Sequence, residues 1–182
     1  MRRRFANIAF TDQVQRQQER HGSRALYARQ GAPGAADEVL GPQEAAFLAR
    51  ASGFYIATVS ESGWPYVQHR GGPRGFLRVL SPLQVGFADF RGNRQYVSVG
   101  NAVSNDRAAI IVMDYAQPRR LKLLGHLRFI DIAAADPALV RALELPGYPA
   151  KVERVALIDV AAFDWNCPQH ITRRFALDEL PA

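Results

Sequence analysis

The chain has 182 residues, the length of one ordinary domain with room for a short appendage. Its hydrophobic fraction of 48% is typical of a globular protein, and no run of eighteen apolar residues occurs, so no membrane span is expected. The net charge of +6 comes mostly from dispersed arginines, which disfavours nucleic acid as the partner and suits a small anionic ligand such as a phosphate ester.

Cysteine and histidine usage narrows the chemistry further. The single cysteine, Cys167, excludes an intrachain disulfide and a cysteine metal cluster, and the four histidines show no metal-ligand spacing. No apolar segment of useful length follows the basic N-terminus, so we expect no secretory signal and a cytoplasmic location. Neither Gly-x-Gly-x-x-Gly nor a P-loop is present, which disfavours Rossmann-type nicotinamide binding.

Helical patterns come first along the chain. Thr11 can cap a helix over about 11–30 that Gly22-Ser23 interrupts, and its few apolar positions indicate a helix on the surface or against a partner subunit. Residues 31–37 are predicted to form a loop. A second helix is predicted over about 42–52, with Pro42 in its first turn.

From residue 54 the pattern becomes that of β-strands. Strands are predicted at residues 54–59, 64–70, 76–80, 83–88, 108–115, 121–132 and 152–163. One short helix, capped by Asp136, is predicted to run to about Leu145. Six or seven short antiparallel strands with few helices predict a mainly β fold, built as a small closed or half-open barrel.

The segment from Gln68 to Pro73 places polar groups at a strand end. Side chains alternate along a strand, so Gln68 and Arg70 share one face and His69 takes the other. The two glycines that follow let the backbone approach a ligand and leave N–H groups for an anion. The alternative is a wide hairpin connection with solvated Arg and His side chains.

The segment from Asp89 to Asn101 is richer in hydrogen-bonding side chains. Arg94 offers a planar fork suited to phosphate, and Ser98 and Asn101 can donate to phosphate oxygens. Asn93 and Gln95 can serve either a phosphate or the carbonyls of a ring. A long polar surface loop is the alternative, although such loops usually carry Lys and Glu and this segment has neither.

Two further clusters complete the candidates. Arg120 and Lys122 share a face of one predicted strand, where they either complete a phosphate site or protect an edge strand. Near the C-terminus, Trp165 can stack on a flat ring and an arginine can pair with an anionic substrate, or the segment simply packs on the barrel. Cys167 and His170 are poor candidates for nucleophilic catalysis, because no third residue orients the histidine.

Several strings resemble the pyridoxamine 5'-phosphate oxidase-related, FMN-binding split-barrel family over about residues 40–175. The strings are His-Arg-Gly-Gly-Pro at 69–73, Gly-Asn-Arg-Gln-Tyr at 92–96, Arg-Leu-Lys at 120–122 and Asp-Trp-Asn-Cys-Pro-Gln-His-Ile at 164–171. The resemblance implies a six-stranded antiparallel split β-barrel with flanking helices, formed by residues 41–182 after an N-terminal helical extension over 1–40. It also implies a homodimer with FMN at the subunit interface.

The resemblance also implies which residues bind the cofactor. The candidates are Gln68, His69, Arg70, Asp89, Asn93, Arg94, Gln95, Ser98, Asn101 and Lys122, with Trp165 and Arg174 contributed by the second subunit. The oxidase itself has Arg about where Gln68 stands and Ser-Arg-Lys about where residues 96–98 stand. FMN binding therefore carries over better than oxidation of pyridoxamine 5'-phosphate.

The leading hypothesis is an FMN-dependent oxidoreductase, an oxidase or a reductase, acting on an unidentified small molecule. No catalytic acid or base is assigned, because flavin hydride transfer does not require one. The alternative is a non-enzymatic carrier or sensor for flavin, haem or another tetrapyrrole on the same barrel.

Overall fold

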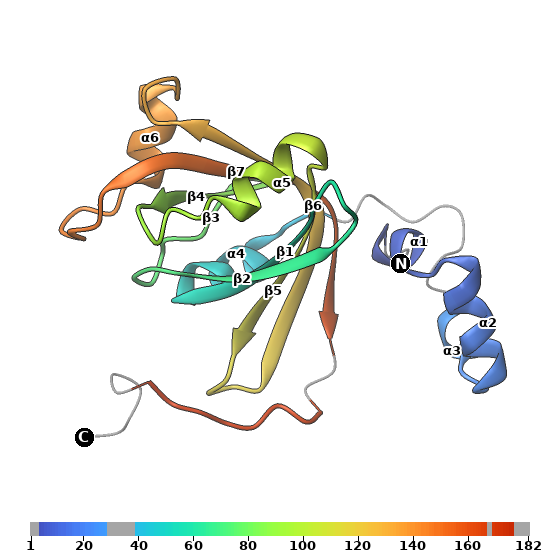
Figure 1. The fold of residues 1–182 in the computed structure, drawn as a ribbon. Helices are drawn as coiled ribbons and strands as arrows, with labels where there is room; N and C mark the ends of the chain where they lie inside the picture. The colour runs from blue at the N-terminus through green and yellow to red at the C-terminus, as the bar shows by residue number, and fades with distance from the viewer. Residues whose placement is uncertain (1–3, 29–38, 167–168, 177–182) are drawn as a thin grey trace.

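The computed structural model describes residues 4–28, 39–166 and 169–176, so the predicted 31–37 loop and Cys167 lie outside the described residues (Figure 1). In chain order the elements are α1 (Arg4–Ala9), α2 (Asp12–Arg20), α3 (Arg24–Ala28), α4 (Pro42–Arg50), β1 (Gly53–Val59), β2 (Pro65–Gly71), β3 (Arg78–Ser81), β4 (Gln84–Phe90), α5 (Val97–Ser104), β5 (Arg107–Asp114), β6 (Arg119–Asp131), α6 (Pro137–Leu143) and β7 (Val152–Asn166). No helix in these described ranges is long and apolar enough to cross a membrane.

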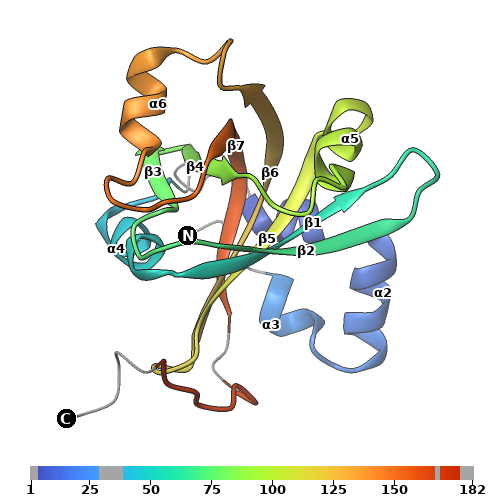
Figure 2. The same ribbon diagram turned by 60° about the vertical axis from the view of Figure 1, so that its left-hand side comes forward.

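The strands form one antiparallel sheet in the order β2-β1-β5-β6-β7-β4-β3. The mainly β architecture with flanking helices agrees with expectation, but the sheet has seven strands rather than six. The long strands β6 and β7, with 13 and 15 residues, pair along most of their length and join its two halves. Figures 1 and 2 show how strongly the sheet curves, which brings its two ends toward each other.

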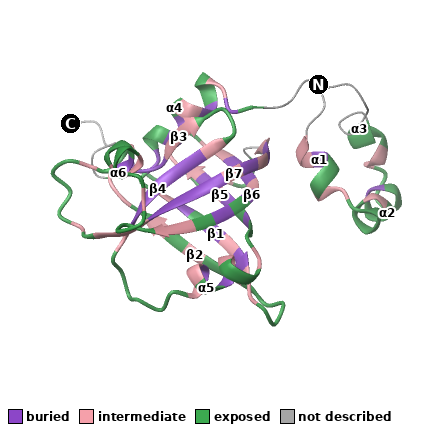
Figure 3. Cartoon of the chain, turned by 90° about the horizontal axis from the view of Figure 1, so that it is seen from above, coloured by how far each residue is buried: buried purple, intermediate pink, exposed green. Residues whose placement is uncertain are grey.

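The core lies on the concave side of this sheet. Alternate residues of β1 are buried, as the two-residue period of a strand requires. Phe54 stacks on Phe76 at 5.7 Å between ring centroids and meets Phe87 edge-on at 5.2 Å. These rings and the aliphatic side chains around them form the main cluster of buried residues, which Figure 3 shows concentrated on the strands.

One glycine is required where β6 meets β7. A Cβ on Gly125 would lie 2.5 Å from the carbonyl oxygen of Asp159, so only glycine allows this approach. The register of the two strands shifts between Leu124 and Gly125, which is a bulge of the kind that bends a sheet.

The helices flank the sheet (Figure 1). α4 begins as predicted at Pro42, and the Glu44 carboxylate accepts the Gly41 N–H at 3.0 Å. α5 is a helix in a segment predicted only as a polar loop, and it packs against β1 and β6. α1 was also not predicted; it packs against β7, and α1–α3 lie to one side of the sheet in Figure 1.

Candidate functional site

A cavity of about 160 Å³ lies where β2, the segment after β4, the start of α5 and the start of β7 converge; we call it the loop cavity. Its lining residues are Tyr66, Gln68, Arg70, Phe90, Gly92, Asn93, Arg94, Gln95, Tyr96, Val97, Val99, Glu153 and Arg154. Gln68 and Arg70 reach it together because they share one face of β2. The structure thus brings the two polar segments of the sequence into one site.

A buried carboxylate organises the base of the loop cavity. Asp89 is 1% exposed and accepts hydrogen bonds from Arg70 at 2.7 Å and from Arg154 Nε at 2.9 Å. Burial disfavours the charged form of Arg154, but its hydrogen bond to Asp89 and the carboxylate charge outweigh this and raise the pKa of Arg154. Two guanidinium groups are therefore held in place by one negative charge.

The loop between β4 and α5 takes a conformation that few non-glycine residues adopt. Arg94 and Tyr96 have φ values of 60° and 54°, in the left-handed region. Arg94 Nε donates to Tyr96 Oη at 3.4 Å, and this bond is the main cause of the raised pKa of Arg94. The Arg154 guanidinium lies 4.8 Å from the centroid of the Tyr96 ring, so Tyr96 contacts both arginines.

Charge and backbone geometry both favour an anion here. Three guanidinium groups, of Arg70, Arg94 and Arg154, line the cavity, whereas the carboxylates beside them are those of Glu153 and of the buried Asp89, which leaves an excess of positive charge. Arg70 Nε is buried without a hydrogen-bond acceptor among the described residues. α5 begins at the cavity without a side-chain cap, and the first N–H groups of an α-helix have no partner within it.

Two predicted phosphate ligands lie behind this surface instead. Ser98 is fully buried and donates to Gln68 Oε1 at 3.1 Å, which fixes the Gln68 side chain that lines the cavity. Asn101 is 7% exposed and donates to the Thr58 hydroxyl at 3.0 Å, which ties α5 to β1. In this arrangement both side chains support the site rather than line it.

Four predicted residues lie outside the loop cavity in a single chain. His69 is on the opposite face of β2, 5.3 Å from Tyr55 between ring centroids. Lys122 pairs with Asp164 at 3.2 Å. Trp165 Nε1 donates to Glu44 at 2.7 Å, and the Arg174 guanidinium lies 5.3 Å from the centroid of the Tyr115 ring.

Sequence reasoning missed Arg154 and Tyr96 as members of the site. Tyr96 stands within a quoted string, but its ring was given no role. Arg154 lies near the start of β7, far along the chain from the other residues of the site. It reaches the site because it is the direct partner of Asp89 in the β4–β7 pairing. Only the pairing of those two strands could have identified it. In the described ranges, no three His, Cys, Asp or Glu side chains are grouped to hold a metal ion.

Comparison with known proteins gives matches at the level of structure. No family model matches the chain, and no curated protein matches it by sequence. HupZ of Group A Streptococcus superposes with a TM-score of 0.54 and 15% identity, over 75% of this chain and 99% of that one. A candidate pyridoxamine 5'-phosphate oxidase of Lactobacillus delbrueckii superposes with a TM-score of 0.51 and 18% identity, over 70% of this chain and 95% of that one. The chain therefore shares the fold of HupZ and of the candidate pyridoxamine 5'-phosphate oxidase, in agreement with the family that its sequence strings resemble.

Proposed function

We propose that this protein binds FMN, with the phosphate end of the cofactor in the loop cavity. The observation that carries the proposal is the excess of positive charge there, next to the uncapped start of α5 and the buried Arg70 Nε. A phosphate monoester supplies both the negative charge and the acceptor oxygens that these donors lack. The likeness to a candidate pyridoxamine 5'-phosphate oxidase, together with the strings of the sequence, favours FMN among phosphate esters.

Different residues of the cavity would bind different parts of FMN, according to their chemistry. Arg94 and Arg70 would hold the phosphate with the N–H groups at the start of α5, while Arg154 keeps the local potential positive. Asn93 and Gln95 carry amides that can bond the sugar hydroxyls or the ring. Gln68 presents its amide with its oxygen already engaged by Ser98, which directs its NH₂ group toward the ligand.

Size favours a site completed by a second copy of the chain. A cavity of about 160 Å³ is smaller than the roughly 300 Å³ at which sites for drug-sized ligands begin, so the flavin ring needs additional surface. We infer a homodimer in which the ring lies between subunits. Trp165 is half-buried and Arg174 exposed in the single chain, so both can still meet a ring bound mainly by the other copy.

When bound, FMN supplies the redox chemistry, which makes an oxidoreductase the proposed activity. The protein's own residues bind and orient the cofactor, and no acid or base is assigned to its reaction. The alternative, a non-enzymatic carrier, would bind flavin in the same way but would not turn over a substrate. NADPH reduction followed by catalytic turnover of an acceptor would identify the enzyme, and stably bound flavin without turnover would identify the carrier.

The spectrum of the purified protein tests the proposal. Yellow protein with flavin absorbance bands that releases FMN on denaturation is the expected result. Colourless protein that takes up no added FMN contradicts it, and a haem spectrum would favour the tetrapyrrole alternative.

A further inference from the structure

An apolar groove of about 220 Å³ lies on the outer face of the sheet, the face turned away from the core; we call it the outer groove. Its lining residues are Phe5, Tyr55, Ala57, Val67, Ala109, Ile110, Ile111, Lys122, Leu123 and Leu124. Ala57 is the direct partner of Val67 on β2 and of Ala109 on β5, so these three side chains are neighbours on one face. Ile56, next to Ala57 in the chain, points into the core instead.

The outer groove is apolar where an antiparallel sheet normally presents polar side chains to water. Val67 is 61% exposed, and the apolar strip continues through Ala57 and Ala109 to Leu124 of β6. In the described part of the chain, only Phe5 of α1 lines the groove from outside the sheet. Contiguous exposed apolar side chains are typical of a contact surface.

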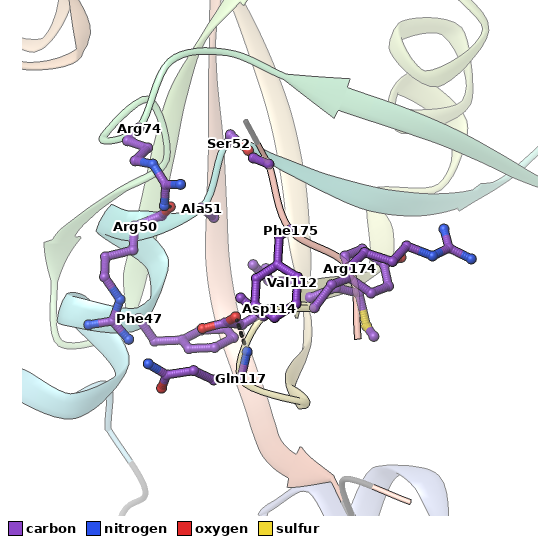
Figure 4. A pocket seen from close by; sticks show the side chains of 14 residues that line it. Phe47, Arg50, Ala51, Ser52, Arg74, Val112, Asp114, Gln117, Arg174 and Phe175 are labelled. Atoms are coloured by element: carbon purple, nitrogen blue, oxygen red, sulfur yellow. Dashed lines mark hydrogen bonds between the residues drawn. The ribbon is translucent and has the colours of Figure 1, made fainter. Parts of the chain in front are cut away.

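Another cavity, of about 320 Å³, shows what a cover from the same chain looks like. It lies beside the turn between β5 and β6, and Arg174 and Phe175 of the C-terminal segment line one side of it (Figure 4). The Arg174 N–H donates to the Tyr115 carbonyl at 3.3 Å, which holds this segment at the end of β5. The described part of the C-terminal segment, residues 169–176, does not line the outer groove.

The N-terminal helices carry a second set of uncovered apolar side chains; we call residues 4–28 the arm. These side chains are Ile8, Val14, Leu26 and Tyr27, and Leu26 is 74% exposed. α1, α2 and α3 have six, nine and five residues, and helices this short are marginal in water unless they pack on other structure. The arm therefore needs a packing surface.

The arm is held together internally, but only α1 packs closely on its own sheet. Arg24 of α3 donates to Gln15 of α2 at 2.9 Å, and Tyr27 meets Phe10 edge-on at 5.5 Å between ring centroids. α1 packs against β7 and contributes Phe5 to the outer groove. Figures 1 and 3 show α2 and α3 beside the sheet rather than on it, so most of the groove stays open.

A second copy of this chain can cover both surfaces at once. In a twofold-symmetric dimer every contact occurs twice, so the arm of each copy can meet the groove of the other. The groove also continues toward a residue predicted to contact the flavin, because His69 is the direct partner of Tyr55 in the β1–β2 pairing and shares its face. His69 lies outside the loop cavity of its own chain. A partner seated on this face would lie next to it.

We propose that α2 and α3 of one copy pack on the outer groove of a second copy, so that the two arms are exchanged across the dimer; this rests on the homodimer inferred for the flavin site. Leu26 and Tyr27 of the arm cover Tyr55 and Val67 of the partner sheet. The simpler explanation is that the exposed apolar side chains are scattered on the surface and contact nothing. It predicts a dimer that does not depend on the arm.

Dissociation of the full-length dimer, measured by analytical ultracentrifugation over a dilution series, separates the two explanations. Leu26→Glu in the arm and Val67→Glu in the groove each place a carboxylate in the apolar contact, and each should weaken the dimer roughly tenfold or more. Val103→Glu is the matched control, because Val103 is 87% exposed on α5 and lines neither the groove nor the loop cavity. It should leave the dissociation constant unchanged.

Photo-crosslinking locates the contact without relying on a weakened dimer. Leu26 is replaced by the photo-crosslinker benzoylphenylalanine, and dimers are mixed from isotope-labelled and unlabelled chains. Mass spectrometry of the digested product should find position 26 joined to β1, β2 or β5, with one labelled and one unlabelled peptide in the same product. Both measurements are made with and without saturating FMN.

A monomeric protein overturns the proposal, and so does a dimer that neither Leu26→Glu nor Val67→Glu weakens. Crosslinks confined to one copy also overturn it, since they would place the arm on its own sheet. Equal weakening by Val103→Glu counts against it as a non-specific effect of charge. A dimer that crosslinks through the arm without taking up FMN would support this contact and contradict the flavin site. FMN uptake by a dimer that ignores both substitutions would do the reverse.

Discussion

Arg70 Nη1 lies 2.7 Å from Asp89 Oδ1, and this contact joins strands from opposite ends of the sheet. β2 is the first strand in the spatial order and β4 the last but one, so no backbone ladder connects them. Asp89 is bonded at the same time to Arg154 of β7, the strand next to β4. The triad therefore closes the gap in the curved sheet and forms the base of the loop cavity.

Replacing Asp89 by Asn should destabilise the fold. The substitution leaves two largely buried guanidinium groups without their counter-charge, and we expect a loss of about 3 kcal/mol in the free energy of unfolding. Chemical denaturation measures it. Asp131→Asn changes an exposed position at the end of β6, so its free energy of unfolding should be close to that of the original protein. Equal stability of the two variants would contradict the role given to Asp89.

Arg94→Gln should separate binding from folding. Arg94 is exposed, and among the described residues its side chain hydrogen-bonds only to Tyr96, so the thermal midpoint should not change, while FMN affinity falls roughly tenfold or more. Thermal melting and flavin titration measure the two effects. Arg16→Gln on α2 removes the same charge far from the site, and a similar loss of affinity there would point to a non-specific charge effect.

Ser98 and Asn101 should respond differently although both are buried polar residues of α5. Ser98→Ala should cost about 1 kcal/mol of stability and weaken FMN binding, because Gln68 loses the bond that orients it. Asn101→Ala should cost about 1–2 kcal/mol by leaving the Thr58 hydroxyl unpaired, with FMN affinity retained. If Asn101→Ala abolishes FMN binding in a folded protein, Asn101 touches the cofactor after all.

The packing and emission of the Trp165 indole should depend on its hydrogen bond to Glu44. The Glu44 carboxylate accepts both Trp165 Nε1–H and the Gly41 N–H, and a glutamine has only one acceptor oxygen for two donors. Glu44→Gln should therefore lower stability by about 1–2 kcal/mol and shift the emission of Trp165. Glu61→Gln, in the exposed turn after β1, is the matched control and should change neither quantity.

The sequence predicted strands better than it predicted helices. Runs of β-branched and aromatic residues located β1, β2, β5, β6 and β7 to within a few residues. α5 was missed because valines, serine and glycine are weak helix formers, so this helix depends on packing against β1 and β6. The sheet has seven strands. The residue pattern predicted six or seven strands, whereas the resemblance implied a barrel of six.

The candidate site was predictable only where its residues cluster along the chain. Gln68, Arg70, Asn93, Arg94 and Gln95 all line the loop cavity, because each of their two segments follows or ends a strand at the same rim. The role of Arg154 could not be predicted from the sequence, because its position in the site depends on the β4–β7 register. The assignments of Lys122, Trp165 and Arg174 to the flavin remain predictions, since they depend on a second subunit.

A comparison of FMN with riboflavin tests the central claim most directly. The two molecules share the ring and sugar chain and differ in the phosphate, which we place among Arg70, Arg94 and the start of α5. Titration of flavin-free protein, followed by flavin fluorescence, should show one FMN per chain with riboflavin bound at least tenfold more weakly. The Arg94→Gln variant should lose most of that preference. Equal affinity for both flavins, or binding of neither, would contradict the account.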